Sequence, residues 1–148
     1  MIRLDEVADR LQAEIEAFAS DTRIGNAAQF STLVEKNQTP QVTPAAFVLP
    51  GPLQGGQAQA MTGAFVQNFS ETVIVVLFVK VAGDARGGRA IDEITPLIRQ
   101  VVEAVAGWAP EDAVGVFTLA NGELVGSQRG HLIYQLNFAL NDQLRIQP

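Results

Sequence analysis

The glycine-rich turn at residues 83–89, with the sequence GDARGGR, is the first candidate for chemistry. Backbone N–H groups at a helix N-terminus bind phosphate oxygens, so a turn of this kind before a helix favours anion binding. The stretch matches neither the dinucleotide fingerprint nor the P-loop, and Ala90 lacks the hydroxyl that would bind magnesium. A flexible turn is the simpler interpretation, and nucleotide binding is the alternative.

Other residue types that carry chemistry are isolated in the sequence. His131 is the only histidine and there are no cysteines, so the ligand set that a metal needs is not visible. An edge or capping role is expected for His131. Asp92 and Glu93 are adjacent, so their side chains point apart and make a poor acid and base pair. The serines lack a nucleophile-elbow context. We therefore expect a protein that is not an enzyme and uses no metal or cofactor.

Composition is typical of one globular domain over residues 1–148. Ten Lys and Arg against 16 Asp and Glu give a formal net charge of −6, which disfavours a nucleic-acid-binding surface. The first residues, MIRLDEVADRL, carry acids where a signal peptide needs an apolar core, so we expect no export signal. No apolar run approaches the roughly 20 residues of a membrane span, so no membrane partner is expected.

The stretch ETVIVVLFVKV, residues 71–81, is predicted to be a central strand. It is rich in Val, Ile and Phe and does not alternate with polar residues, which indicates burial of both faces. The preceding AFVQNF either forms a hairpin with it or continues as one long bent strand. Helices on one face would cover half of this strand, so another subunit is expected to cover the rest.

Apolar residues at three- and four-residue steps predict two main amphipathic helices, one near residues 4–18 and one whose apolar positions run from Ile91 to Val105. Gly107 and Pro110 are expected to end the second helix. The second helix starts either at Pro96, with Thr95 as its N-cap, or near Ala90 with a kink at the proline. A short helical piece is predicted at residues 27–35.

Residues 36–63 are predicted to be a long irregular connection, interrupted by one short strand at AAFVL. Four prolines and a run of Gly and Gln support this interpretation. Connections of this length in compact domains usually bind something or order on assembly, so the segment is a candidate contact arm.

The C-terminal part is predicted to form strands at VGVFTL, ELVG and HLIYQLNFAL, with Asn121-Gly122 as a hairpin turn. The order of helix, arm, strands, helix and strands predicts an α+β fold. We expect a mostly antiparallel sheet with the two main helices packed on one face, plus the long arm.

With these elements in this order, the sequence resembles the tail terminator proteins of long-tailed bacteriophages and prophages. The resemblance spans nearly the whole chain. Its pieces are IGNAAQF after the first helix, TPAAFVLP at residues 43–50, Ala85-Arg86-Gly87, IDEI at residues 91–94, Gly107-Trp108 with Pro110, NGELV, and LIYQLNF at residues 132–138. Pro96 and the segment near residues 51–61 depart from the family pattern.

The resemblance implies a structural protein of the virion tail that assembles in the host bacterial cytoplasm. It implies a ring, usually a hexamer, that caps the tail tube, ends its polymerisation and offers a surface for docking the DNA-filled head. The implied partners are copies of the chain, the tail tube protein and a head-completion or connector protein, with DNA only as passing cargo. An acidic channel would repel the DNA phosphates.

Apolar residues of the arm and the next strand, together with three arginines, are expected to contact neighbouring subunits or the tube. These residues are Phe47, Leu49, Leu53, Met61, Phe65, Arg86, Arg89 and Arg129. Two alternatives remain: a head-to-tail connector or tail-completion subunit, and a small ligand-binding α+β domain or enzyme that uses residues 83–89.

Overall fold

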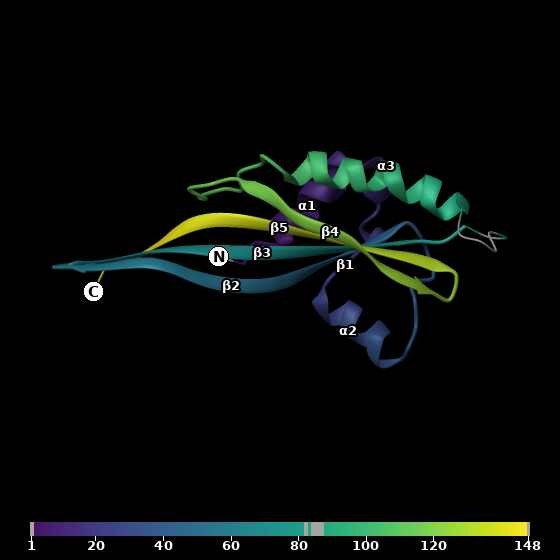
Figure 1. Cartoon of the computed structure of the whole chain (residues 1–148), viewed down its shortest axis with the longest axis horizontal. Helices are drawn as coiled ribbons and strands as arrows, with labels where there is room; N and C mark the ends of the chain where they lie inside the picture. The colour runs from purple at the N-terminus through teal and green to yellow at the C-terminus, as the bar shows by residue number, and fades with distance from the viewer. Residues whose placement is uncertain (1, 82, 84–87, 148) are drawn as a thin grey trace.

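The computed structural model describes residues 2–81, 83 and 88–147, which form one five-stranded sheet flanked by helices (Figure 1). The strands are β1 Ile24–Gly25, β2 Ala45–Met61, β3 Ala64–Val79, β4 Phe117–Gln128 and β5 His131–Ile146, and the helices are α1 Leu4–Glu14, α2 Ala27–Glu35 and α3 Gly88–Val105. The strand order is β1-β2-β3-β5-β4, and only the short β1–β2 pair is parallel. The predicted α+β fold with a mostly antiparallel sheet is confirmed.

None of the helices in the described ranges has the length and apolarity that crossing a membrane requires.

Strand β3 is the centre of the sheet, hydrogen-bonded to β2 along one edge and to β5 along the other. The segment AFVQNF and the apolar run that follows it are one continuous strand, which decides between the two sequence-based alternatives. Successive side chains of a strand point to opposite faces. Val75 and Leu77 accordingly join one core cluster, whereas Val76 and Phe78 join another.

Helices α1 and α3 pack side by side on one face of the sheet, as predicted for the two main helices (Figure 1). Helix α3 contains Pro96 in its interior, so the helix does not start at the proline. Pro96 is exposed, and the Asp92 carbonyl that loses its helical hydrogen bond is on the same solvent side. Gly107, with φ of +81°, ends the helix as expected.

Helix α2 packs on the opposite face, near one end of the sheet (Figure 1). The Phe30 ring lies edge-on to Phe47, with 5.5 Å between ring centroids, and 6.5 Å from the Phe78 ring. A capping box starts the helix: Asn26 Oδ1 accepts from the Gln29 N–H, and Gln29 Oε1 accepts from the Asn26 N–H. The chain itself therefore covers part of the second face of β3, the face that was expected to need another subunit.

The prediction that residues 36–63 form an irregular arm is wrong in conformation, because residues 45–61 form a strand paired with β3. Proline is tolerated here since β2 is an edge strand beyond its short contact with β1, and an edge strand leaves one row of backbone groups unpaired. The ladder also shifts between Pro50 and Leu53, where a bulge accommodates Pro52.

The predicted hairpin turn at Asn121-Gly122 is also wrong, because both residues lie inside β4. The turn to β5 is Arg129-Gly130, where φ is +52° and +81°. A register shift between Leu119 and Asn121 marks a bulge at the Asn-Gly position instead.

We expect Asn26→Ala to lower the free energy of unfolding by about 1 kcal/mol, because the substitution removes the side-chain acceptor at the start of α2. Urea denaturation followed by circular dichroism measures the change. Ser31→Ala, at an exposed position within the same helix, is the matched control and should not destabilise. Equal stability of the Asn26→Ala variant and the original chain would show that the cap does not hold α2 in place.

Candidate functional site

Strands β2, β3 and β5 continue past the helices as a narrow three-stranded extension, at the left of Figure 1. We call this extension the finger and define it as residues 53–71 of the β2–β3 hairpin together with residues 140–146 of β5. The turn Thr62-Gly63 joins its first two strands, and Gly63 has φ of +84°, which favours glycine. The β3–β5 ladder runs without a shift from Phe65 to Val79, so the finger is continuous with the sheet of the body.

The β2–β3 part of the finger carries no charge before Glu71 at its root. Residues 37–70 contain no Asp, Glu, Lys, Arg or His, although 18% of the whole chain is charged. Charged residues are depleted in the buried centres of protein interfaces, and lysine or proline normally protects a free sheet edge. This uncharged stretch is a sequence signal that pattern reasoning about turns missed, because the Pro and Gly content of the same residues pointed to a loop.

The two faces of the finger differ in chemistry. The strand register places Leu53, Phe65, Leu144 and Ile146 on the same side of the sheet as α1 and α3. The opposite side carries mainly amides and hydroxyls, namely Gln54, Asn68, Ser70, Asn141 and Gln143. The finger is therefore amphipathic, with an apolar face that continues the core and a polar face of amides and hydroxyls that carries one charge, Arg145 opposite Val66.

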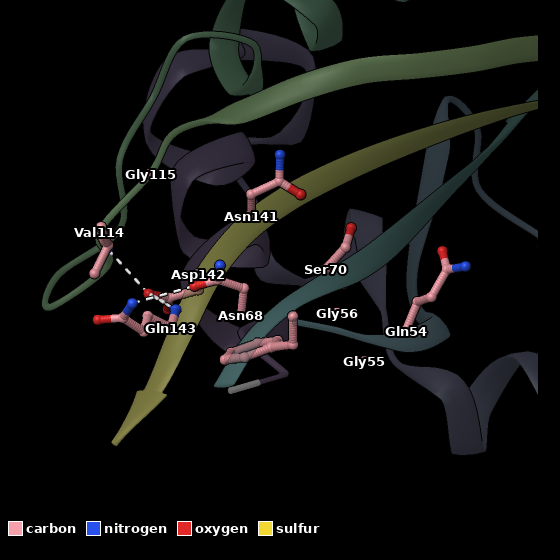
Figure 2. Close-up of a pocket in the computed structure, with 11 residues that line it drawn as sticks. Gln54, Gly55, Gly56, Asn68, Ser70, Val114, Gly115, Asn141, Asp142 and Gln143 are labelled. Carbon is pink, nitrogen blue, oxygen red and sulfur yellow. Dashed lines mark hydrogen bonds between the residues drawn. The ribbon is translucent and has the colours of Figure 1, made fainter. Parts of the chain in front are cut away.

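An open groove of about 700 Å³ crosses the base of the finger on the polar face (Figure 2). Side chains from all three strands line it, with Val114 and Gly115 at one end. Gln143 Nε2 donates to Asn68 Oδ1 at 3.1 Å across the groove floor. A Cβ atom on Gly115 would lie 2.4 Å from the Asn141 carbonyl oxygen, so only glycine lets the chain approach β5 this closely.

A buried ionic cluster fixes the root of the finger to the body. Glu71 of β3 is only 2% exposed, and its carboxylate accepts from the Ile2 N–H and lies 3.6 Å from Arg3 Nε. Arg3 Nη2 donates to Asp142 Oδ2 at 3.0 Å, and Arg3 Nη1 donates to the Glu111 carbonyl at 2.7 Å. One arginine thus joins the residues before α1 to β3, β5 and the segment before β4.

The environment of Asp142 favours its ionised form. Burial opposes ionisation, but the N–H groups of Gln143 and Val114 and the Arg3 guanidinium all donate to the carboxylate and outweigh it. The pKa of Asp142 is therefore lowered from its ordinary value. Asp142 is a structural ion-pair partner at the edge of the groove.

The interface residues predicted from sequence lie in three different places: on the finger, under α2, and, for the described arginines, away from both. Leu53, Met61 and Phe65 lie on the finger, with Met61 64% exposed beside the tip turn. Phe47 is buried under α2, and Leu49 packs against the same cluster, so a partner reaches Phe47 only by displacing α2.

The predicted arginines are not on the finger. Arg89 lies in the first turn of α3 and Arg129 in the β4–β5 turn; both are exposed, at the end of the sheet opposite the finger (Figure 1). Arg86 is outside the described residues.

The residues considered for chemistry do not converge in the described part of the chain. His131 is buried, with its Nε2 atom 3.2 Å from the Pro40 carbonyl and its ring edge-on to Phe78. Within residues 2–81, 83 and 88–147, the structure holds no group of three or more His, Cys, Asp or Glu side chains suited to a metal ion. Most of the turn at residues 83–89 lies outside the described residues.

The described residues thus form a sheet covered by helices and extended by an amphipathic, largely uncharged finger. The family model for the phage tail terminator protein matches residues 1–148, the whole chain. The chain belongs to the phage tail terminator family, a family of structural proteins, and is a component of the phage tail. No curated protein matches the sequence.

We expect Arg3→Ala to lower the free energy of unfolding by about 3 kcal/mol, because two buried carboxylates then lose their cationic partner. Thermal and urea denaturation would measure the loss. Arg99→Ala is the matched control, since Arg99 forms an exposed pair with Glu103 at 2.8 Å and its removal should leave stability nearly unchanged. Similar losses in both variants would show that the cluster does not anchor the finger.

The stabilisation contributed by Asp142 should depend on pH. Its pKa is lower in the folded chain than in the unfolded chain, so its contribution is complete above the unfolded pKa of about 3.9 and is lost as the pH falls through the folded pKa. The difference in unfolding free energy between the original chain and Asp142→Asn should therefore be constant near neutral pH and shrink below about pH 4. Urea titrations at stepped pH test this, and a gap that stays constant into acid would contradict it.

Proposed function

We propose that the chain forms a closed ring, a hexamer, that caps the phage tail tube, ends its polymerisation and presents a surface to the head. The tail tube protein and a head-completion or connector protein are the partners, and DNA passes through the ring without being retained. Assembly takes place in the host cytoplasm. Membership of the terminator family supports a role in the tail, and the finger supports the contact role within it.

The single observation that carries this proposal is the solvent-exposed finger, whose β2–β3 hairpin carries no charge from residue 53 to residue 70. Leu53 is 50% exposed on the apolar face, and Phe65 lies on the same face closer to the tip. Exposed apolar surface without charges to desolvate is suited to burial against another protein. The finger and the basic positions Arg89 and Arg129 lie at opposite ends of the molecule, which gives a ring two chemically different sides (Figure 1).

Light scattering and negative-stain imaging of the purified protein test the ring. The expected particle has a six-fold outline and about six times the subunit mass of 15.8 kDa. A particle with another closed symmetry would overturn the hexamer, and a chain that stays monomeric even when mixed with tail tubes would overturn the ring.

Capping is tested by adding the protein to tail tube protein during polymerisation and measuring tube lengths by electron microscopy. We expect the original chain to stop growth, and Leu53→Asp to lose at least ten-fold in capping potency because a charge on the apolar face is buried without a partner. Ile91→Asp is the matched control, since Ile91 is exposed to a similar degree, 52%, but lies on α3 away from the finger. Equal loss in both variants, or no loss in Leu53→Asp, would contradict a contact role for the finger.

A further inference from the structure

Both lateral edges of the finger lack a strand partner among the described residues. Strand β1 pairs only with Ala46 and Phe47, so the outer edge of β2 is free from there to the tip. Strand β4 pairs with β5 only as far as Leu140, and Gly115 touches Asn141, so the outer edge of β5 is free from Asp142 to Ile146. Each copy of the chain therefore offers two different free edges on the same three-stranded element.

The free edges lack most of the devices that normally keep sheet edges apart. Between Leu53 and Met61, β2 carries no lysine, no proline and no other charge, and its one such device is a bulge between Gly55 and Ala58. The free part of β5 has one exposed charge, Arg145, and its ladder with β3 has no bulge. Strand β4, the other edge of the sheet, has two register shifts, as β2 does, and in addition carries the charged Glu123. The edges of the finger are thus the better templates for added strands.

We propose that a second copy of the chain occupies these edges: β2 of one finger pairs with β5 of the next, closing the fingers into a continuous barrel. This proposal rests on the ring of the proposed function and specifies its seam. Pairing unlike edges is a heterologous contact, which is what a closed ring of copies requires. The groove of Figure 2 crosses all three strands of the finger and reaches the β5 edge beside Val114 and Gly115, just before the free edge begins at Asp142.

Strand direction makes the seam specific. Both β2 and β5 run antiparallel to β3, so they run in the same direction as each other. Rotation about a ring axis that runs roughly along the finger keeps that direction, so β5 and the neighbouring β2 meet as parallel strands. A two-fold dimer would instead pair like edges, β5 with β5 or β2 with β2, as antiparallel strands.

Closure in this way also decides which face of the finger lines the ring. Helices α1 and α3 are too bulky for the concave side of a closed sheet, so the amide face points inward. Six copies would contribute about 18 strands, a number at which barrels enclose an aqueous channel. The channel would then be lined mainly by amides, with Arg145 as its one charged position on each copy, and not, as the sequence suggested, by acids.

Engineered cysteines test the seam, because the chain has no cysteine of its own. Gln59 on β2 is level with Arg145 on β5, since both are opposite Val66 of β3. Neighbouring strands lie about 4.8 Å apart, close enough for a disulfide between opposed positions. Gln59→Cys is mixed in turn with Asn141→Cys, Gln143→Cys and Arg145→Cys, a panel that allows for a register shift, and each mixture is oxidised.

The expected result is a disulfide dimer with at least one member of the panel in the mixture, and none when any single variant is oxidised alone. A chain carrying both matching cysteines should give a ladder on a non-reducing gel that ends at the number of subunits in the ring. Thr118→Cys on β4 is the edge control and should not cross-link to Gln59→Cys.

Four results would overturn the proposal. Disulfides between identical variants would indicate a two-fold seam, and disulfides through Thr118→Cys would place the seam at β4. A ring of the expected mass that forms no cross-link with any member of the panel would overturn the seam alone. A chain that light scattering shows to be monomeric under all conditions would overturn the ring and the seam together.

Discussion

Strand β3 is hydrogen-bonded on both edges along nearly its whole length, but its two faces are covered over different lengths. Helices α1 and α3 cover one face of its apolar half, and α2 covers the opposite face only near one end of the sheet. An apolar strand with covered faces is stable within one chain, whereas the finger half is not covered by the described residues. This difference separates the molecule into a self-sufficient body and an extension that is suited to contact.

The ionic cluster around Arg3 couples these two parts. Glu71 and Asp142 mark the point where the sheet leaves the helices, and both carboxylates depend on a residue near the start of the chain. Removing one partner of a buried ion pair costs far more than the pair itself contributes, so the cluster resists any local separation of the finger from the body. The orientation of the finger is thereby tied to the position of α1.

Patterning alone predicted the parts of the fold that depend on local periodicity, such as α1, α3 and the buried run of β3. It failed for β2, where the prolines predicted an irregular connection. Pro50 and Pro52 are compatible with a strand there only because one edge of β2 is unpaired. It also failed at Asn121-Gly122, where a bulge uses the same residues that a turn prefers. The cluster at Glu71 could not be foreseen, since its partner Arg3 is distant in sequence. Of the candidate contact residues, Leu53, Met61 and Phe65 share the finger, whereas sequence gave no sign that Phe47 belongs to the core under α2.

The separation of charge from the finger has a consequence for the speed of association. Nearly all ionised groups lie on the body, and the formal net charge of −6 makes two free copies repel each other as they approach. The screening length is about 8 Å at physiological ionic strength, so this repulsion acts only at short range and weakens when salt is added. It slows the approach of two copies although their fingers are suited to bind each other. Added salt should therefore accelerate the encounter of copies while leaving the contact itself, which contains few charges, almost unaffected. The solubility of the free chain and the adhesiveness of its finger are in this way controlled by different residues.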